Sequence, residues 1–252
     1  MSEDQKNKEF TRRLKVVVPY RDREQHFREF LPHVQEFLED AGIPYHVVVA
    51  EQAEGLSFNR GAMKNIGFLL GGPSDYTCFH DVDYLPLSAD YSWSDNPACL
   101  VMTGANRIST RIEGPARPIQ LDMANFFGGV VVVPDMLFRQ VDGYSNEYWG
   151  WGYEDTDLAA RFNAAGISVT RRPGTFCPLP HDSHGYDADG YLNADASFNR
   201  ALFLRKWKSG RTAKADGIST LAYEILSRET LCATNREISC ERIKVRLFPA
   251  PR

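Results

Sequence analysis

Several common sequence signatures are missing from this chain of 252 residues, and each absence excludes a class of protein. No G-x-x-x-x-G-K-S/T segment occurs, so a P-loop is excluded, and the Gly150-x-Gly152 pair lacks the third glycine and the preceding strand of a Rossmann fingerprint. Apolar runs such as 130–133 are far too short to span a bilayer. Residues 1–6 are polar and lack the apolar core of a secretory signal. We therefore expect a soluble protein.

Neither cysteine content nor charge indicates a special compartment or partner. The five cysteines are scattered and form no C-x-x-C pair, which favours reduced, mostly buried thiols. Cys232 with Cys240, or Cys78 with Cys99, could nevertheless pair in an oxidising compartment. The net charge of −4 gives no overall attraction to nucleic acid, whereas a local phosphate site would need only a few arginines.

Strand and helix patterns alternate through the first two-thirds of the chain. Strand patterns cover 14–18, 46–49, 76–80 and 128–133, and helix patterns cover 27–38, 59–70 and 157–165, with a kink or a break expected at Pro32. The alternation predicts an α/β fold with a mixed, mostly parallel central sheet. We expect a single domain, with a tail at 1–12, the main body at 13–230 and an extension at 231–252 packed on the same domain.

Two carboxylates, Asp81 and Asp83, follow the apolar strand pattern at 76–80. Residues two apart on a strand point to the same side, so both carboxylates are expected to emerge together at the carboxyl edge of the sheet, where α/β proteins bind ligands. Two hard oxygen ligands there suit Mg²⁺ or Mn²⁺ bridging a diphosphate. A solvated loop or a helix cap is the alternative, since two further D-x-D triplets occur in the chain.

Two histidines, His181 and His184, are spaced to reach one metal ion from a loop. Together with a strand-end carboxylate they would form an N,N,O set, which suits Mn²⁺ or Zn²⁺ better than Mg²⁺. A pair of surface histidines is the alternative, and zinc hydrolase chemistry also remains open. The surrounding region, 181–195, is rich in Asp, Gly and Tyr without periodicity, which is typical of a long functional loop.

In the segment 146–157, two tryptophans separated by glycine are followed by three acids, Glu154, Asp155 and Asp157. Aromatic faces stack on sugars, carboxylates accept hydroxyl protons, and glycines let a lid move. An acidic helix N-terminus would explain the acids but not the tryptophans. Elsewhere, Arg21, Arg23 and Arg60 could hold a diphosphate or a base, or could simply be surface arginines.

Taken in order, these segments resemble the β-1,4-galactosyltransferase family, glycosyltransferase family 7. The resemblance runs from residue 16 to about residue 226. It is carried by V-P-Y-R-D-R-E-Q-H at 18–26, F-N-R-G-A-M-K-N-I-G-F at 58–68, H-D-V-D-Y-L-P-L at 80–87, F-G-G-V at 127–130, Y-W-G-W-G-Y-E-D at 148–155, the loop at 181–184 and D-G-I-S-T-L at 216–221.

The resemblance implies a GT-A type nucleotide-sugar-binding fold. It also implies an inverting, Mn²⁺-dependent transfer of galactose from UDP-galactose to a hydroxyl of an acceptor sugar, with Mg²⁺ as a possible substitute. The partners would be a UDP-sugar donor and a glycan or glycoconjugate acceptor, with no nucleic acid and no membrane segment. A full-length chain of this kind would be cytoplasmic and of bacterial type. The alternative is a lumenal Golgi catalytic domain that lacks its anchor.

Carried over position by position, the resemblance also implies roles for individual residues. Asp155 would be the catalytic base, Glu154 a donor-sugar contact and Trp151 the mobile tryptophan that closes over the donor. The donor site would comprise Pro19, Arg21, Arg23, Phe58, Arg60, Asp81, Val82, Asp83, Trp151 and Glu154. The acceptor site would comprise Phe126, Gly152, Tyr153, Asp155 and Thr156. The metal ligands would be Asp83, His181 and His184.

Three departures from the family pattern leave the substrates open. Thr156 replaces an acid that helps to bind the acceptor, and Phe126 stands where enzymes selective for galactose have tyrosine. The segment 197–200 only partly matches a pocket for an N-acetyl group. Transfer from UDP-N-acetylgalactosamine or another UDP-hexose is therefore an alternative, as is a catalytically silent nucleotide-sugar-binding protein.

Overall fold

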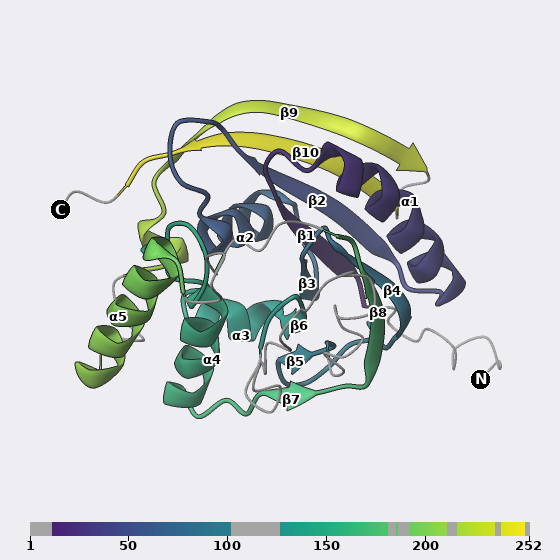
Figure 1. The fold of residues 1–252 in the computed structure, drawn as a ribbon. Helices are drawn as coiled ribbons and strands as arrows, with labels where there is room; N and C mark the ends of the chain where they lie inside the picture. Colours follow the sequence, from purple (N-terminus) through teal and green to yellow (C-terminus); the bar gives the residue numbers. More distant parts are fainter. Residues whose placement is uncertain are drawn as a thin grey trace, which may run out of the picture.

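Strand β1 (Leu14–Tyr20) lies near the middle of an eight-stranded sheet with the order β7-β5-β6-β3-β1-β2-β10-β9 (Figure 1). The computed structural model describes residues 12–101, 127–180, 185, 192–210, 216–234 and 238–249. β1 is buried along its whole length, as expected of a valine-rich strand with both faces covered. It pairs in parallel with β2 (Tyr45–Gln52) and β3 (Tyr76–His80). The predicted mixed, mostly parallel sheet is confirmed in this central part.

The remaining strands extend this core on both sides. β6 (Val130–Pro134) runs antiparallel to β3, and β5 (Ala98–Cys99) and β7 (Thr170–Arg171) complete that edge. On the other side β10 (Ile238–Leu247) runs parallel to β2, and β9 (Tyr223–Thr234) forms the outer edge. β4 (Tyr84–Ala89) and β8 (Gly174–Pro178) form a separate antiparallel pair. The expected boundary between residues 230 and 231 thus falls within β9.

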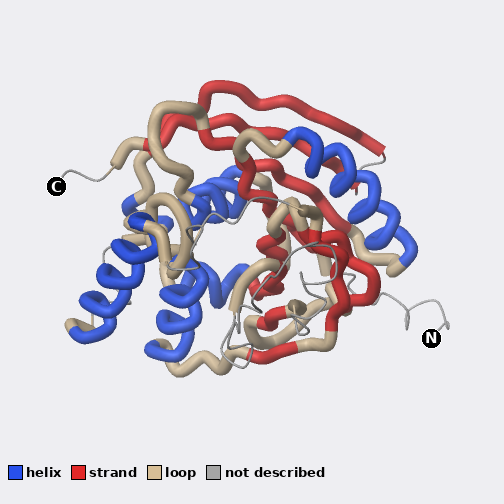
Figure 2. The backbone as a smooth tube through the Cα atoms, viewed as in Figure 1, coloured by secondary structure: helices blue, strands red, loops and turns tan. Residues whose placement is uncertain are grey.

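Helix α1 (Glu24–Asp40) is a single helix of 17 residues with Pro32 inside it, so of the kink or break expected there, the break does not occur. Pro32 is exposed, so the backbone hydrogen bond that it removes lies on the solvent side. Buried Phe27 and Phe30 before the proline, and Val34 and Leu38 after it, hold both halves on the core. α1 covers one side of β1 and β2, while α2 and α3 lie on the other (Figures 1 and 2).

Helix α2 (Arg60–Leu70) lies unusually close to the sheet, because it has glycine where it crosses β1. A Cβ atom at Gly67 would overlap the Val17 side chain, and one at Gly71 would overlap Val48. The remaining helices are α3 (Asp135–Gln140), α4 (Glu154–Ala164) and α5 (Ala194–Lys208), followed by the 3-10 helix η5 (Ile218–Thr220). The close approach of α2 sets the distance between the α2 side chains and the carboxyl edge of the sheet.

Replacing Gly67 by alanine should lower the free energy of unfolding by about 1–3 kcal/mol, because the added methyl group overpacks the contact with Val17. Urea denaturation of the single variants Gly67→Ala and Val17→Ala and of the double variant would measure this. The double variant should be less destabilised than the sum of the two single variants, since shortening Val17 makes room for the new methyl group. Additive losses would contradict the overlap.

The five cysteines are free thiols in this structure. Cys232 lies directly opposite Cys240 in the β9–β10 ladder, whereas Cys78 and Cys99 are buried on different strands. No helix in the described part of the chain is both long and apolar enough to cross a bilayer.

Candidate functional site

The carboxyl ends of β1 and β3 and the first turn of α2 meet at one edge of the sheet. α2 begins at Arg60 because the Asn59 side chain caps it, accepting a hydrogen bond of 2.8 Å from the amide of Ala62. Arg60 and Lys64 are four residues apart and therefore lie on the same face of α2. That face is turned toward Asp81, the first residue after β3. Arg60 Nη1 is 3.3 Å from Asp81 Oδ2 and Lys64 Nζ is 3.9 Å from Asp81 Oδ1.

The first turn of α4 brings two more carboxylates to the same place. Glu154 Oε1 is 3.3 Å from Arg60 Nη1, and Asp155 Oδ1 is 2.9 Å from Lys64 Nζ. The predicted start of this helix at Asp157 is wrong, because α4 begins at Glu154. Tyr153, in the left-handed conformation with φ of 73°, turns the chain immediately before it. The positive end of the helix dipole favours acids in this first turn.

The two tryptophans precede this turn in a segment built around glycine. Gly150 and Gly152 have φ of 78° and 93°, which side chains rarely adopt, and a Cβ atom at Gly150 would also overlap the Asp195 carboxylate. The amide of Gly150 donates a hydrogen bond of 2.9 Å to the carbonyl of Phe58, next to the α2 cap. The segment is therefore tied directly to the arginine-bearing end of α2.

Helix α5 holds the same segment from the other side. The Asn199 side chain is buried and donates hydrogen bonds of 3.0 Å to the carbonyls of both Trp149 and Trp151. The Trp151 ring is packed so closely on Gly185 that a Cβ atom at residue 185 would overlap it. Trp151 thus lies beside the residue that follows 181–184 in the chain.

The residues after β3 form a turn rather than a continuation of the strand, so the expected strand alternation of Asp81 and Asp83 is wrong. The amide of Asp81 donates to the carbonyl of Gly129 at 2.8 Å, and the amide of Tyr84 donates to the carbonyl of Asp81 at 3.3 Å. The turn directs Asp81 inward to the α2 cations. The carbonyl of Asp83 accepts from the amide of Leu179 at 2.7 Å, just before residues 181–184 in the chain.

Burial and charge oppose each other in this cluster. Burial raises the pKa of Asp81 and of Glu154, while nearby Arg60 acts to lower both. Burial alone would lower the pKa of Lys64, but the carboxylates of Asp155 and Asp81 outweigh it and raise that pKa. Asp155 itself keeps about one-seventh of its side chain exposed, with a relative exposure of 15%. The edge therefore combines two paired cations with an excess of carboxylates.

The residues at and after the end of β1 that were expected to bind the donor lie at the neighbouring corner. Arg21 Nη1 donates a hydrogen bond of 2.6 Å to the carbonyl of Leu56, and its guanidinium lies 5.2 Å from the centre of the Phe58 ring. Pro19 is buried inside β1, Arg23 precedes α1, and Val82 is buried in the turn between the two aspartates. The structure thus brings Arg21, Phe58 and Arg60 together, whereas Pro19 is buried within the strand.

Three predicted site residues, Phe126, His181 and His184, lie outside the described residues. Within the described part of the chain, no group of three or more His, Cys, Asp or Glu side chains is arranged to hold a metal ion. Thr156 is exposed on α4, and Gly152 and Tyr153 are half-buried beside it. His80, which precedes the turn, is buried, and both of its ring nitrogens already have partners: Nδ1 lies 2.9 Å from the carbonyl of Asp81 and Nε2 lies 2.7 Å from the Tyr91 hydroxyl.

Sequence reasoning missed Lys64 and Tyr144. Lys64 is 1% exposed, and its ammonium lies 4.8 Å from the centre of the buried Tyr144 ring. The only available signal for Lys64 was a lysine at the fourth position after Arg60 in an otherwise apolar helix pattern. Tyr144 gave no signal, because the loop that carries it is positioned by residues distant in the sequence.

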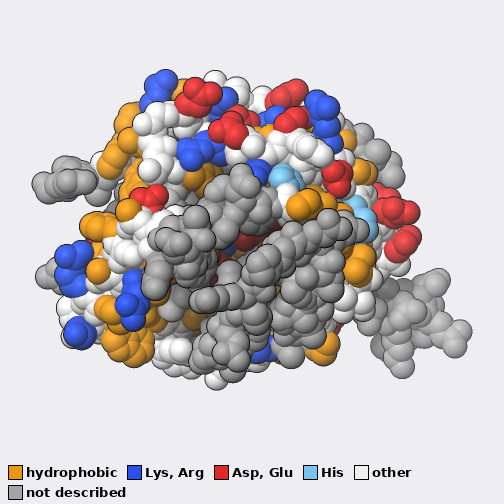
Figure 3. All heavy atoms as spheres, in the orientation of Figure 1, with side chains coloured by type: hydrophobic (Ala, Val, Ile, Leu, Met, Phe, Trp, Pro, Cys, Tyr) orange, Lys and Arg blue, Asp and Glu red, His pale blue; other side chains and the backbone are white. Residues whose placement is uncertain are grey.

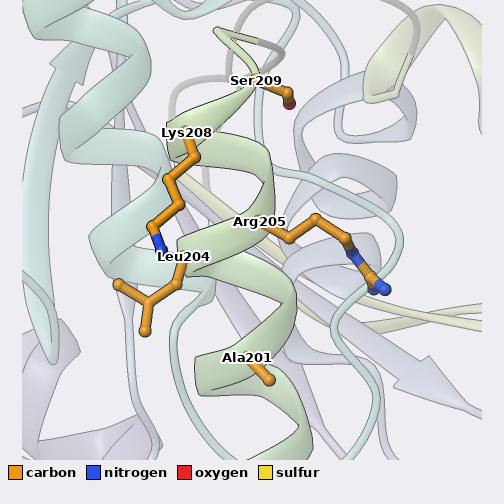
Figure 4. Close-up of a pocket in the computed structure, with 5 residues that line it drawn as sticks. All are labelled: Ala201, Leu204, Arg205, Lys208 and Ser209. Atoms are coloured by element: carbon orange, nitrogen blue, oxygen red, sulfur yellow. The ribbon is translucent and has the colours of Figure 1, made fainter.

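The outer face of α5 carries a shallow pocket that is separate from this cluster. Its lining, shown in Figure 4, comes from one helix and comprises Ala201, Leu204, Arg205, Lys208 and Ser209. Hydrophobic and basic side chains are mixed over the same region in the space-filling view (Figure 3). None of the predicted site residues lines this pocket.

Comparison with known proteins gives consistent matches along the chain. The family described as the N-terminal region of glycosyl transferase group 7 matches residues 5–94, and the N-terminal domain of galactosyltransferase matches residues 112–184. The chain is 32% identical to beta-1,4-galactosyltransferase 7 of Drosophila melanogaster over 219 residues, which cover 85% of this chain and 63% of the relative. It is also 32% identical to human beta-1,4-galactosyltransferase 4 over 228 residues, 86% of this chain and 60% of the relative. The chain thus spans less than two thirds of the length of either relative.

A solved structure extends the similarity to three dimensions. A mutant of the Drosophila beta-1,4-galactosyltransferase 7, in complex with manganese, UDP-Gal and xylobiose, superposes with a TM-score of 0.69 and 26% sequence identity, covering 95% of each chain.

Proposed function

Because the chain belongs to glycosyltransferase family 7 and has the GT-A fold, we propose that it is an inverting, Mn²⁺-dependent galactosyltransferase. It would move galactose from UDP-galactose to a hydroxyl of an acceptor sugar and form a β-linked, 1,4-connected product. The observation that carries the proposal is the placement of Asp155. Its carboxylate lies at the ligand-binding edge of the sheet, 2.9 Å from the Lys64 ammonium, and keeps part of its surface exposed.

The charge of the site fits a divalent cation. Four carboxylates, Asp81, Asp83, Glu154 and Asp155, belong to the same edge as two cations, Arg60 and Lys64. Asp81 Oδ1 is buried and has no hydrogen-bond partner among the described residues. Asp83, with His181 and His184, would hold the ion. The chemistry that the ion supplies when bound is neutralisation of the charge that develops on the UDP leaving group.

The chain's own residues account for the other requirements of transfer. Asp155 would take the proton of the acceptor hydroxyl as that oxygen attacks the anomeric carbon from the face opposite UDP. Arg21, stacked over Phe58, would bind the UDP portion. The glycines around Trp151 would let the indole close over the donor and exclude water. A single displacement converts an α-linked donor into a β-linked product.

The acceptor is proposed only as a sugar hydroxyl in a glycan or glycoconjugate. The similar Drosophila enzyme was solved with xylobiose, so xylosides belong in the first acceptor panel. Enzymes selective for galactose have tyrosine at the position of Phe126, so UDP-N-acetylgalactosamine is the second donor to test. An exposed Thr156 in place of an acid is compatible with an acceptor that makes fewer polar contacts on α4.

The proposal is tested by incubating the purified chain with Mn²⁺ and a grid of donors and acceptors. The donors are UDP-galactose, UDP-N-acetylgalactosamine and UDP-glucose, and the acceptors include xylosides and N-acetylglucosaminides. We expect UDP release that depends on both acceptor and Mn²⁺, with a β1,4 linkage read by NMR. UDP-galactose binding without any transfer across the grid would instead indicate a silent binding protein.

Replacing Asp83 by alanine should abolish the stimulation of UDP binding by Mn²⁺, because the variant loses the carboxylate expected to bridge protein and ion. Titration calorimetry with UDP, with and without Mn²⁺, measures this. Asp95→Asn is the control and should behave as wild type. It removes an exposed carboxylate that accepts a hydrogen bond from Trp93 Nε1. An unchanged Mn²⁺ effect in Asp83→Ala would remove Asp83 from the ligand set.

A further inference from the structure

Lys64 is a buried cation on α2, and the residues around it in this helix are buried as well. Seven residues next to it in α2, from Gly61 to Phe68, are also buried. Its Nζ lies 2.9 Å from Asp155 Oδ1, 3.9 Å from Asp81 Oδ1 and 4.8 Å from the centre of the Tyr144 ring. An ammonium is unfavourable in such a place unless carboxylates pair with it. The nearest of its carboxylate partners is the Asp155 that the proposed reaction uses as its base.

Arg60 and Lys64 divide the carboxylates between them. Arg60, one turn earlier on α2, is 3.3 Å from both Asp81 and Glu154. Lys64 is the cation that reaches Asp155 directly. The site would therefore keep a cation beside its donor-binding carboxylates without Lys64, but Asp155 would lose its ion-pair partner. The contact with Asp155 distinguishes the function of Lys64 from that of Arg60.

We propose that Lys64 is a positioning residue for Asp155: its ammonium holds one carboxylate oxygen at 2.9 Å and leaves the other to face the acceptor hydroxyl. The inference rests on the proposed function, because it assumes that Asp155 is the base. It deepens that function by assigning a pH-setting role to a residue on a different helix. Because Lys64 is only 1% exposed, it would act through Asp155 rather than on the substrate.

Within the described residues, the titratable and charged groups near Asp155 come from several elements. They are Lys64 and Arg60 on α2, Glu154 on α4, Asp81 after β3, Tyr144 in the loop after α3 and Cys99 on β5. Two of these groups are cations and two are carboxylates. Among the described residues, removing Lys64 would leave Asp155 beside two carboxylates with the more distant Arg60 to balance them. Asp155 would then bind a proton more readily, since nearby like charges and burial both favour the neutral acid.

The test is the pH dependence of kcat/KM for the acceptor, measured on the full chain with Mn²⁺ and UDP-galactose at saturating concentrations. In Lys64→Met we expect the acid limb of the profile to move to higher pH by about 1–3 units. The KM for UDP-galactose should stay within about twofold of wild type, because Arg60 and Arg21 remain. Lys64→Arg keeps the charge, so its acid limb should stay at the wild-type position.

A second buried lysine that contacts α2 serves as the matched control for the general effect of removing a buried cation. Lys15 is 2% exposed, and its Nζ donates a hydrogen bond of 2.9 Å to the carbonyl of Phe68 at the far end of the same helix. Lys15→Met should lower stability and leave the acid limb in place. Lys64→Gln, which is polar and neutral, serves if Lys64→Met does not fold, and the same shift is expected of it.

The outcomes distinguish failure of the inference from failure of the function. An acid limb unchanged in Lys64→Met or Lys64→Gln, in an enzyme that still transfers galactose, would overturn the role of Lys64 and leave the proposed function standing. A shifted limb in Lys64→Arg would also overturn it, because the charge would then not be the cause. A wild-type chain that transfers no sugar would overturn the proposed function itself.

Discussion

Replacing Asp155 by asparagine should reduce the rate of galactosyl transfer by about 10²–10⁴-fold, the usual contribution of a positioned general base. Asparagine has nearly the same shape as aspartate, and its amide oxygen can still accept the hydrogen bond that Lys64 donates to Asp155 at 2.9 Å. The variant should therefore fold and should bind UDP and Mn²⁺ with wild-type affinity. It lacks only a group that can take a proton from the acceptor hydroxyl.

The measurement is kcat with the best donor and acceptor pair, alongside the affinity for UDP in the presence of Mn²⁺ by calorimetry. The matched control is Glu147→Gln, an exposed acid in the segment before α4 whose carboxylate pairs with Lys206 rather than with Lys64. Its transfer rate should change less than threefold. Transfer by Asp155→Asn at the wild-type rate would show that another group acts as the base.

The parts of the fold set by local sequence were predictable, and the strand at 76–80 shows why. Its five residues are all buried, and both predicted ends of the strand agree with the structure. A short, mostly apolar run between turn residues is typical of a buried strand. The same local reasoning was wrong immediately afterwards. The backbone turns at Asp81, held by the carbonyl of Gly129 from a segment 48 positions later, and that contact has no local signal.

The site shows the same division between local and distant information. Arg60, Asp81, Glu154 and Asp155 could be proposed because each stands in a segment whose order resembles a known family. Their mutual distances could not be proposed, since α2, β3 and α4 are brought together only by the sheet and by Gly67 and Gly150. Lys64 was missed because, in sequence, it resembles an ordinary helix-surface lysine, and only burial of its face reveals that it is a partner of Asp155.

Behind the turn that carries Glu154 and Asp155, α4 contains a buried ion pair between Asp157 and Arg161. Arg161 Nε lies 2.7 Å from Asp157 Oδ2, and both side chains are excluded from solvent. The same guanidinium donates to the carbonyls of Val141 and Gly143 at 3.4 and 3.2 Å, and it lies 3.4 Å from Asp216. Arg161 thus connects α4 to the loop that carries Tyr144.

Replacing Arg161 by methionine should lower the free energy of unfolding by up to about 3–5 kcal/mol, because it removes the nearer cation of the buried Asp157 carboxylate and leaves only Lys206, at 3.9 Å, among the described residues. This is a large fraction of the 5–15 kcal/mol typical of a domain. Urea denaturation with an unchanged slope would measure the loss. Asp157→Leu combined with Arg161→Met is the control and should recover much of it, since removing both charges leaves neither unpaired.

The expected effect of Arg161→Met on activity follows from the contact between Arg161 and Asp216. Asp216 accepts hydrogen bonds from the amide of Asn146, at 2.8 Å, and from the Ser145 hydroxyl, so it holds the start of the segment that continues to Trp149 and Trp151. Loosening that anchor should raise the KM for UDP-galactose in Arg161→Met more than it lowers kcat, because Asp155 keeps its own contact with Lys64. A loss of stability below about 1 kcal/mol would mean that contacts other than the Asp157–Arg161 pair hold α4, and with it Glu154 and Asp155, in place.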